Sequence, residues 1–351
     1  MKVNVFGDYY CNEKINICPK FSSVLCNSDL NIINFEAPIV KDITCAIEKV
    51  GANLSHNIET ITNLKELNIT DVCVANNHYF DFGELNAEYS NGALKDESIR
   101  VHGYNTSDKP GRIHYITDNW VIINVAESEY GVKSQEFKSG FLSISDPRLF
   151  VILKKFKDKG TNIILIVHAG LEDVLTPLDS WKDYFRAFID FGVEIVIGHH
   201  PHVPQSHEVY NGKYIYYSLG NFIFQNSDKS DWHKIGQFVS LEISGDELKV
   251  SHGYTRNTSG YISLIEDESS IDEQLEKYFS YPLSLADNYR KLMMMDLKRI
   301  ILSVFYPKIL NFVPYFNKRK SRALDFCIHN LRFETHRFSQ IEYINKEKAR
   351  K

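Results

Sequence analysis

Short, mainly apolar runs recur through the first two hundred residues, and a polar side chain follows each run within two positions. The five clearest runs cover residues 3–6, 32–35, 72–75, 163–167 and 195–197. They are rich in Val and Ile and too short for helices, which is typical of interior strands in a parallel sheet. The pattern therefore predicts an α/β protein.

Segments with helical spacing lie between these runs. In residues 58–67, apolar side chains recur every three positions, and residues 181–191 place aromatic side chains at the spacing that buries one helix face. We interpret those aromatics as core packing. Residues 208–218 predict a β-hairpin, because Asn211-Gly212 separates two β-rich runs. Residues 121–125 predict another strand, and residues 127–131 after it are interpreted as a polar loop that can line a cleft.

Metal-binding side chains stand where the five apolar runs end. Open α/β sheets place their ligands at the carboxyl ends of the strands. The donors in chain order are Asp8, Glu36, Asn77 with His78, His168, and His200 with His202. Carboxylates mixed with imidazoles suit Mn, Fe or Zn, and this set exceeds the ligands of one tetrahedral ion. We therefore predict two divalent metals.

The spacing of His200 and His202 predicts how their side chains point. Alternate residues of an extended segment point the same way, so His200 and His202 are predicted to face one site and His199 to point away. Pro201 between them disfavours a helix at His200.

Several motifs together resemble one known family. In order they are Gly7-Asp8, Asn34-Phe35-Glu36-Ala37-Pro38, Ala75-Asn76-Asn77-His78 with Asp81, His168-Ala169-Gly170 with Glu172, Gly198-His199-His200-Pro201-His202, and Ser218-Leu219-Gly220-Asn221-Phe222. From about residue 2 to residue 224 the chain resembles the bacterial CapA, or poly-γ-glutamate capsule synthesis, proteins. These are a branch of the calcineurin-like metallophosphoesterase superfamily.

The resemblance implies a fold and a division of roles. It implies a four-layer αββα sandwich of the metallophosphoesterase type over residues 1–275, in which residues 237–243 and 248–254 complete a second sheet. Glu36 would bridge two metals, and His78 would be the catalytic residue beside the substrate phosphate. The other metal ligands would be Asp8, Asn77, His168, His200 and His202, and the supporting or substrate-contacting residues would be Asn34, Asp81, Glu172, His199 and Asn221.

Two positions depart from the superfamily pattern. Its usual Asp-x-His is Asp8-Tyr9-Tyr10 here, so one metal would have one imidazole fewer. The common His-Trp-Gly is His168-Ala169-Gly170, which removes a large wall of the pocket and implies a roomier cleft or a different substrate.

Composition narrows the class of protein. The chain has 351 residues, 43% of them hydrophobic, with a net charge of −5, so we expect no nucleic-acid partner. Its six cysteines are scattered, which favours free thiols in a reducing compartment. The sequence contains no signal peptide and no apolar stretch approaching 18 residues. We expect a cytoplasmic protein.

The carboxyl-terminal region, residues 276–351, differs in charge from the rest. From residue 288 onward it holds 15 Lys and Arg against 5 Asp and Glu. We predict a basic helical appendage. One hypothesis packs it against the catalytic domain or a second copy, and the other lays it on the anionic inner membrane face as a peripheral contact.

The sequence supports two hypotheses about function. The first is a CapA-like metal-dependent hydrolase of the phosphoesterase type, acting on a phosphorylated or polymer-linked substrate in capsule or cell-envelope polymer synthesis, with capsule-synthesis proteins as partners. A glutamyl-amide hydrolase using the same ions is a variant of it. The alternative is a non-catalytic accessory subunit that supports polymer synthesis or export. Tyr10 favours the alternative, whereas His78 and the His200-Pro201-His202 group favour the enzyme.

Overall fold

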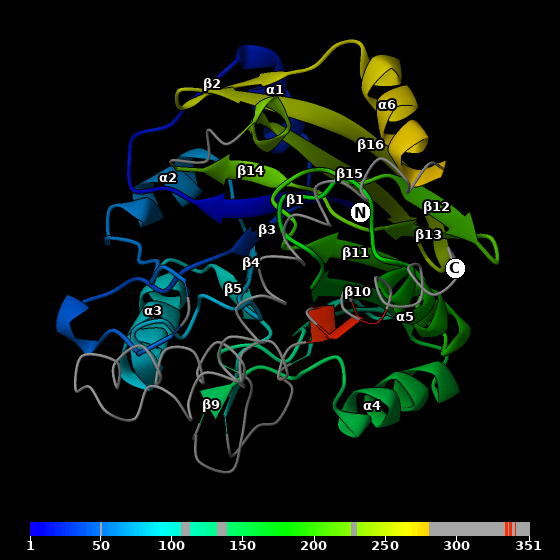
Figure 1. The fold of residues 1–351 in the computed structure, drawn as a ribbon, viewed down its shortest axis with the longest axis horizontal. Coiled ribbons are helices and arrows are strands. Elements are labelled where there is room, and N and C mark those ends of the chain that lie inside the picture. The colour runs from blue at the N-terminus through cyan, green and yellow to red at the C-terminus, as the bar shows by residue number, and fades with distance from the viewer. Residues whose placement is uncertain are drawn as a thin grey trace, which may run out of the picture.

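The computed structural model describes residues 1–49, 51–106, 113–131, 139–225, 230–280, 334, 335, 337, 338 and 341. These residues form two large β-sheets and six α-helices (Figure 1). The predicted α/β class is confirmed.

The larger sheet has nine strands. Its spatial order is β2 (Asn16–Ile17), β17 (Tyr261–Leu264), β16 (Glu247–Thr258), β15 (Ile235–Ser244), β1 (Lys2–Tyr10), β3 (Leu30–Phe35), β4 (Asp71–Cys73) and β5 (Arg100–His102), with β14 (Asn221–Phe224) also on β1. On one side of β1, the neighbouring strands β3, β4 and β5 follow in that order through parallel pairs. On the other side, antiparallel pairs join β1 to β15, β15 to β16 and β16 to β17. The strands that carry the predicted site therefore form the parallel half.

The second sheet has six strands. Its order is β12 (His207–Tyr210), β13 (Lys213–Tyr216), β11 (Ile195–His199), β10 (Asn162–His168), β8 (Trp120–Ala126) and β7 (His114–Thr117). Its four central strands are parallel, and the predicted hairpin is confirmed as the antiparallel pair β12 and β13. A separate two-stranded sheet pairs β6 (Asn105–Thr106) with β9 (Ser139–Gly140).

The helices connect strands and cover the outer faces of the sheets. They are α1 (Pro19–Cys26), α2 (Thr60–Glu66), α3 (Gly83–Asp96), α4 (Pro147–Asp158), α5 (Asp179–Asp190) and α6 (Glu268–Ser280), with short 3₁₀ turns at Ile43–Cys45 and Asp231–Lys234. Both helices predicted from spacing are present, as α2 and α5. The start of α4 shows how such a helix begins: Asp146 accepts a hydrogen bond from the Arg148 N–H, and Pro147 occupies the first turn.

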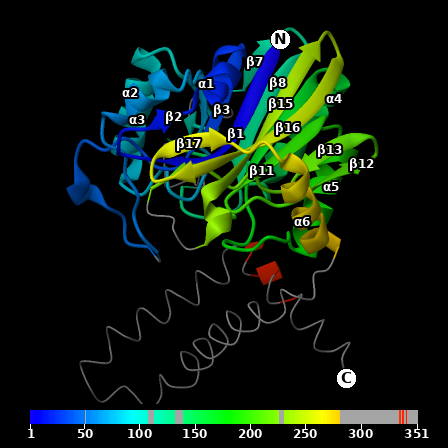
Figure 2. The same cartoon turned by 90° about the horizontal axis from the view of Figure 1, so that it is seen from above.

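Three apolar clusters define the layers. Between the sheets, β1 contributes Val3 and Val5, and β10 contributes Ile164 and Ile166. A second cluster joins the nine-stranded sheet to α1, α2 and α3, and a third joins the six-stranded sheet to α4 and α5. The order is helix, sheet, sheet, helix (Figure 2). Because both faces of each parallel strand are buried, these strands are apolar at nearly every position.

One sheet assignment was wrong. Residues 237–243 and 248–254, predicted to complete a second sheet, belong to β15 and β16 and extend the sheet that contains β1. β15 pairs with the first half of β1, up to Phe6 opposite Phe238, whereas β14 pairs with the second half from Asp8 onward. Both neighbours of β1 on this side are therefore far away in sequence.

The predicted division after residue 275 stays a prediction, and that residue lies within α6. Most of the predicted basic helical region lies outside the described residues. Within the part of the chain that is described, no helix combines the length and apolar character needed to cross a bilayer.

Candidate metal centre

The carboxyl ends of strands from both sheets meet at one place. Asp8 lies in β1 and Glu36 follows β3, whereas His168 ends β10. His200 and His202 follow β11, and all five side chains are buried. Four of the five strand ends considered in the sequence thus converge, although they come from two sheets that face each other.

Two groups of potential ligands share Glu36. Asp8, Glu36 and His202 form one, and Glu36, His168 and His200 form the other, with one donor atom from each residue within 4.8 Å of its partners. The Glu36 Oε1 atom lies 3.5 Å from His202 Nε2 and 3.9 Å from His168 Nε2. In the first group, His202 Nδ1 lies 3.4 Å from the Asp8 carboxylate. Glu36 is therefore common to both groups, and its role as a bridging carboxylate stays a prediction.

The state of Glu36 tests whether ions fit. Its Oε1 is buried and has no hydrogen-bond partner among the residues that the structure describes. A buried carboxylate oxygen without a donor is costly in free energy, and a divalent cation between Glu36 and the imidazoles would remove that cost. Mixed carboxylate and imidazole ligands are those that Mn, Fe and Zn accept. The residues present fit two such ions.

The protonation states also favour metal binding at the second group. Burial lowers the pKa of His200 to about 4, and burial together with the neighbouring His200 lowers the pKa of His168 well below its ordinary range. Both imidazoles are therefore neutral at pH 7, which is the form that binds metals. His202 differs: burial opposes its charge, but Glu36 and Asp8 raise its pKa to about 10.

The backbone at the two histidines differs from the prediction. His200 has φ of 99° and His202 has φ of 59°, so the segment is not extended and the predicted alternation was wrong in its geometry. Both side chains reach the site through left-handed backbone instead, a strained conformation that is concentrated at functional sites. His199 does point elsewhere, because its Nε2 lies 3.0 Å from the Phe6 carbonyl oxygen.

Two asparagines orient the ligands. The Asn34 side-chain amide donates to Asp8 over 2.8 Å and to Glu36 over 3.3 Å. Asn221, whose Cα is paired with that of Asp8, has its Oδ1 3.0 Å from His202 Nδ1. Both amides thus contact the potential ligands, and their supporting role stays a prediction.

The segment after β4 adds Asn77 and His78. The Asn77 Oδ1 atom lies 3.0 Å from His168 Nε2, beside the second group. His78 is outside both groups, and its Nδ1 lies 2.7 Å from Asp81 Oδ2. Lys49 forms a buried ion pair with Asp81. Asp81 therefore holds the His78 ring, whereas the roles of Asn77 as a ligand and His78 as the catalytic residue remain predictions.

Carboxylates from the loop after β8 were missing from the predicted site. Glu127 and Glu129 are buried and form a third potential group with His200, whose Nε2 lies 3.9 and 3.8 Å from them. Burial raises the pKa of Glu127 to about 8. The signal existed in the sequence, because Glu127 directly follows an apolar strand as the other donors do. Glu172 is exposed, and its charge acts on His200 and His202.

Tyr10, where the resemblance described above would place a histidine, is partly buried. Its ring packs 5.4 Å from that of His56 and 5.3 Å from that of Phe224. Phe224 in turn packs 4.7 Å from the His202 ring. Tyr10 therefore supports the wall beside the first group and takes part in none of the three potential ligand groups.

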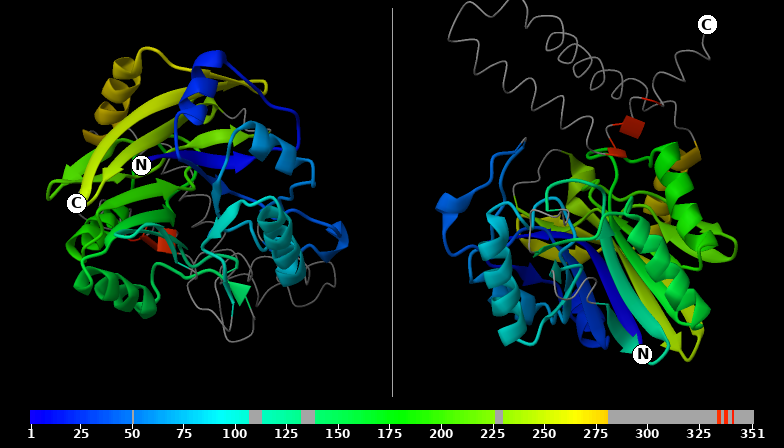
Figure 3. Two further views of the ribbon diagram at one scale, coloured as in Figure 1. Left: turned by 180° about the vertical axis from the view of Figure 1, so that it is seen from behind. Right: turned by 90° about the horizontal axis from the view of Figure 1, so that it is seen from below.

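A segment near the carboxyl terminus closes one side of the site. The described residues between 334 and 341 lie at the end of the sheets away from the amino terminus (Figure 3, right). Thr335 contacts Glu127 and Gly170, and Glu334 accepts hydrogen bonds from Ser128. Sequence patterns gave no signal for this contact.

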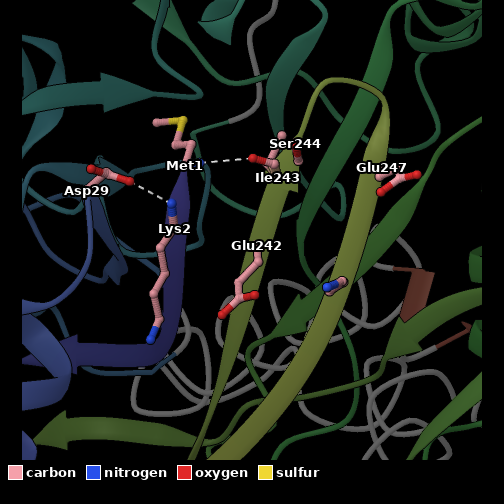
Figure 4. A pocket seen from close by; sticks show the side chains of 8 residues that line it. Met1, Lys2, Asp29, Glu242, Ile243, Ser244 and Glu247 are labelled. Carbon is pink, nitrogen blue, oxygen red and sulfur yellow. Dashed lines mark hydrogen bonds between the residues drawn. The ribbon is translucent and has the colours of Figure 1, made fainter.

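A separate pocket lies at the opposite end of β1 (Figure 4). Its lining residues are Met1, Lys2, Asp29, Glu242, Ile243, Ser244, Glu247 and Lys249. At about 3.3 Å per strand residue, Lys2 and Asp8 are roughly 20 Å apart. This pocket is therefore distinct from the candidate metal centre.

Comparison with known proteins identifies relatives. The family described as bacterial capsule synthesis protein PGA_cap matches residues 12–226. The PGA biosynthesis protein CapA of Bacillus subtilis (strain 168) is 33% identical over 204 residues, covering 56% of this chain and 53% of the relative. The capsule biosynthesis protein CapA of Bacillus anthracis is 32% identical over 234 residues, covering 63% and 55%. The chain thus spans about half the length of the curated relatives it matches.

Similar solved structures are more distant. One crystal structure aligns with a TM-score of 0.40 at 15% identity, covering 71% of this chain and 98% of the other. The crystal structure of TT1561 of Thermus thermophilus aligns with a TM-score of 0.37 at 8% identity, covering 71% and 97%. Neither likeness is strong enough to carry an argument about the fold or the site.

Proposed function

Because this chain belongs to the CapA family of bacterial capsule synthesis proteins, we propose that it is a metal-dependent hydrolase acting in the synthesis of a capsule or other cell-envelope polymer. Its fold would be a sandwich of the metallophosphoesterase type, and its reaction would be of the phosphoesterase class. The substrate would be a phosphorylated or polymer-linked intermediate.

One observation carries the proposal: Glu36 is shared between two groups of ligands and has a buried oxygen without a hydrogen-bond partner. A carboxylate in a purely structural role would be expected to have donors for both oxygens. Two cations bridged by Glu36 would offset the free energy that this buried oxygen costs the protein. Asn34 keeps the other Glu36 oxygen and Asp8 in place.

Each residue then has a defined task. Asp8, Glu36 and His202 would hold one ion, and Glu36, His168 and His200 the other, with Asn77 completing its ligands. When bound, two ions would supply charge stabilisation for the attacking and leaving oxygens of a displacement at phosphorus. His78, held by Asp81, would hydrogen-bond the substrate phosphate. Glu127 and Glu129 would place two further carboxyl groups beside His200.

The test combines metal analysis with turnover. The full chain is purified without chelator, its metal content is measured by mass spectrometry, and hydrolysis of an aryl phosphate monoester and diester is followed with added Mn²⁺. We expect at least two transition-metal ions per chain, and His200→Ala should lose turnover and hold one ion fewer than wild type. His114→Ala, which changes a histidine of edge strand β7, is the matched control and should behave as wild type.

A second candidate function has its own support. Tyr10 packs against His56 and Phe224 instead of offering an imidazole, so the first group has three potential ligands of the His, Cys, Asp or Glu type among the described residues. A protein with one filled metal position and no turnover would be an accessory subunit of polymer synthesis or export. If wild type bound metal but, like His200→Ala, hydrolysed neither ester, then the result would contradict the hydrolase and favour the accessory subunit.

A further inference from the structure

Outside the candidate metal centre, two histidines and an aspartate from three different elements meet. His207 begins β12 in the six-stranded sheet, His252 lies in β16 of the nine-stranded sheet, and Asp272 lies in α6. These elements come together on one side of the molecule, where α6 runs beside the sheets (Figure 1; Figure 2). The three residues thus join both sheets and a helix.

The distances within this group suit a metal ion. One donor atom of each residue lies within 4.8 Å of the other two, the same criterion that the candidate metal centre meets. The His252 Nε2 atom lies 3.2 and 3.3 Å from the two oxygens of Asp272. A good hydrogen bond between an imidazole and a carboxylate is shorter, at about 2.7–2.9 Å. Two ligands of one tetrahedral Zn²⁺ ion, at about 2.0–2.2 Å from it, are about 3.3 Å apart.

Neighbouring side chains hold two of the three donors in position. The Tyr254 hydroxyl donates to Asp272 Oδ1 over 2.6 Å, and the Tyr216 hydroxyl lies 3.3 Å from His252 Nδ1. A ligand of a metal is commonly oriented in this way, by a partner on its other polar atom. His252 Nε2 and the second Asp272 oxygen are therefore directed by contacts that do not require an ion.

His207 completes the group, and the described part of the chain offers no hydrogen-bond partner to its ring. Its ring stacks on that of Tyr216, with centroids 5.0 Å apart, and lies 4.8 Å from the His252 ring. Neither of its ring nitrogens has a hydrogen-bond partner among the described residues. Glu276, one helical turn beyond Asp272 on α6, adds a second negative charge that acts on His207. An imidazole without a partner thus faces a carboxylate-rich helix.

We propose that His207, His252 and Asp272 form a second, separate metal site, which binds one Zn²⁺ or a similar borderline divalent ion. Imidazole nitrogens with a single carboxylate are typical ligands of Zn²⁺, whereas Ca²⁺ and Mg²⁺ prefer oxygen throughout. The His252 and Asp272 side chains are 18% and 38% exposed, so an ion reaches them from solvent. The bound ion clamps α6 to one strand of each sheet, β12 and β16. The site is independent of the proposed function.

The experiment uses the full chain, stripped of metal with a chelator and then desalted. Zn²⁺ is added, and binding is followed by calorimetry and by the shift in melting temperature. Two variants test the site: His207→Asn removes a side chain without hydrogen bonds, and Asp272→Asn keeps the oxygen that accepts from Tyr254. His114→Ala is the control for loss of a histidine elsewhere.

We expect wild type and the control to bind one more Zn²⁺ per chain than either Asn variant, and their melting temperature to rise further with zinc. Removing a residue that only hydrogen-bonds a metal ligand lowers metal affinity by about 10- to 100-fold. Each Asn variant removes a ligand itself, so its loss of Zn²⁺ affinity should be larger. Co²⁺ should give tetrahedral visible absorption that His207→Asn weakens and His200→Ala retains. Equal zinc stoichiometry and equal melting shifts in all four proteins would overturn the proposal, whatever the fate of the hydrolase.

Discussion

Thr335 binds Glu127 through two groups: its backbone N–H donates to Glu127 Oε2 over 3.0 Å, and its hydroxyl lies 2.8 Å from Oε1. The residues are 208 positions apart, and Thr335 lies beyond the part of the chain that the family matches. The same hydroxyl accepts a hydrogen bond from Trp181 Nε1 on α5 over 3.0 Å. A residue near the carboxyl terminus therefore fixes a carboxylate beside His200.

We expect Thr335→Val to lower both stability and turnover. The substitution keeps the backbone bond but leaves Trp181 Nε1 and one Glu127 oxygen with fewer partners, which costs about 1–3 kcal/mol of unfolding free energy. Denaturant unfolding measures the first effect and ester hydrolysis the second. Thr335→Ser retains the hydroxyl and should restore both. Full activity in the Val variant would mean that Glu127 does not need Thr335 to take part in the site.

Glu36→Gln should separate function from stability. The amide cannot bridge two cations, so we expect the loss of both metal ions and of hydrolysis. In the presence of chelator, however, the variant should be at least as stable as wild type. Burial raises the pKa of Glu36 well above its ordinary range, which means that the folded protein disfavours the ionised carboxylate.

Melting curves with and without chelator, alongside metal content, measure this difference. Asn34→Asp is the companion variant, because it alters the amide that donates to Glu36 and Asp8 while Glu36 itself is unchanged. A marked loss of chelator-treated stability in Glu36→Gln would show that Glu36 has a structural role instead.

Much of the site could be predicted because it is built at strand ends. An apolar run of four or five residues followed by Asp, Glu or His is visible without a structure, and parallel strands bring their carboxyl ends to one edge. Asp8, Glu36 and His168 follow this rule, and Asp8 and His168 each belong to a group of potential ligands that includes Glu36. Glu127 follows the same rule but was interpreted as part of a loop, because one carboxylate after one strand is a weak signal.

The remaining features depend on contacts that no local pattern encodes. β1 is paired with β15 along one half and β14 along the other, a choice made by strands more than two hundred residues away. The left-handed backbone at His200 and His202 contradicts local preference, because a non-glycine residue adopts positive φ only where its surroundings demand it. The contact of Thr335 with Glu127 is likewise a product of tertiary packing.

The free energy of unfolding should decrease as the pH falls, because His56 is buried in its neutral form. Burial lowers its pKa from an ordinary value of 6.5 to about 3, so the unfolded chain binds a proton that the folded protein rejects. This contribution to stability is complete above pH 6.5 and is lost as the pH falls toward 3, by up to about 1.4 kcal/mol per pH unit.

His56→Phe tests this sign. The ring still stacks on Phe35, whose centroid lies 4.3 Å from that of His56, while the titrating group is removed. Unfolding free energies of both proteins are measured from pH 7 to pH 4. Other buried histidines are common to the two proteins, so their contributions cancel in the comparison. The unfolding free energy of wild type minus that of His56→Phe should therefore decrease as the pH falls. A difference independent of pH would mean that His56 is protonated in the folded state.

Gly198→Ala should destabilise the strand that carries the two histidines. A Cβ at this position would lie 2.0 Å from the Tyr217 carbonyl oxygen, which is backbone and cannot move aside alone. β11 would have to separate from its neighbour, and we expect a loss of at least the about 1–3 kcal/mol typical of overpacking. Because His200 and His202 follow two and four residues later, metal binding should weaken with it.

Gly92→Ala is the matched control for this substitution. Gly92 lies in α3 with nothing within 4 Å of its added Cβ, so the same change should stabilise the protein by about 0.5–1 kcal/mol. Thermal melts and metal content of both variants give the comparison. If Gly198→Ala behaved like Gly92→Ala, then the two strands would tolerate a wider separation, and the position of His200 and His202 would not depend on their close approach.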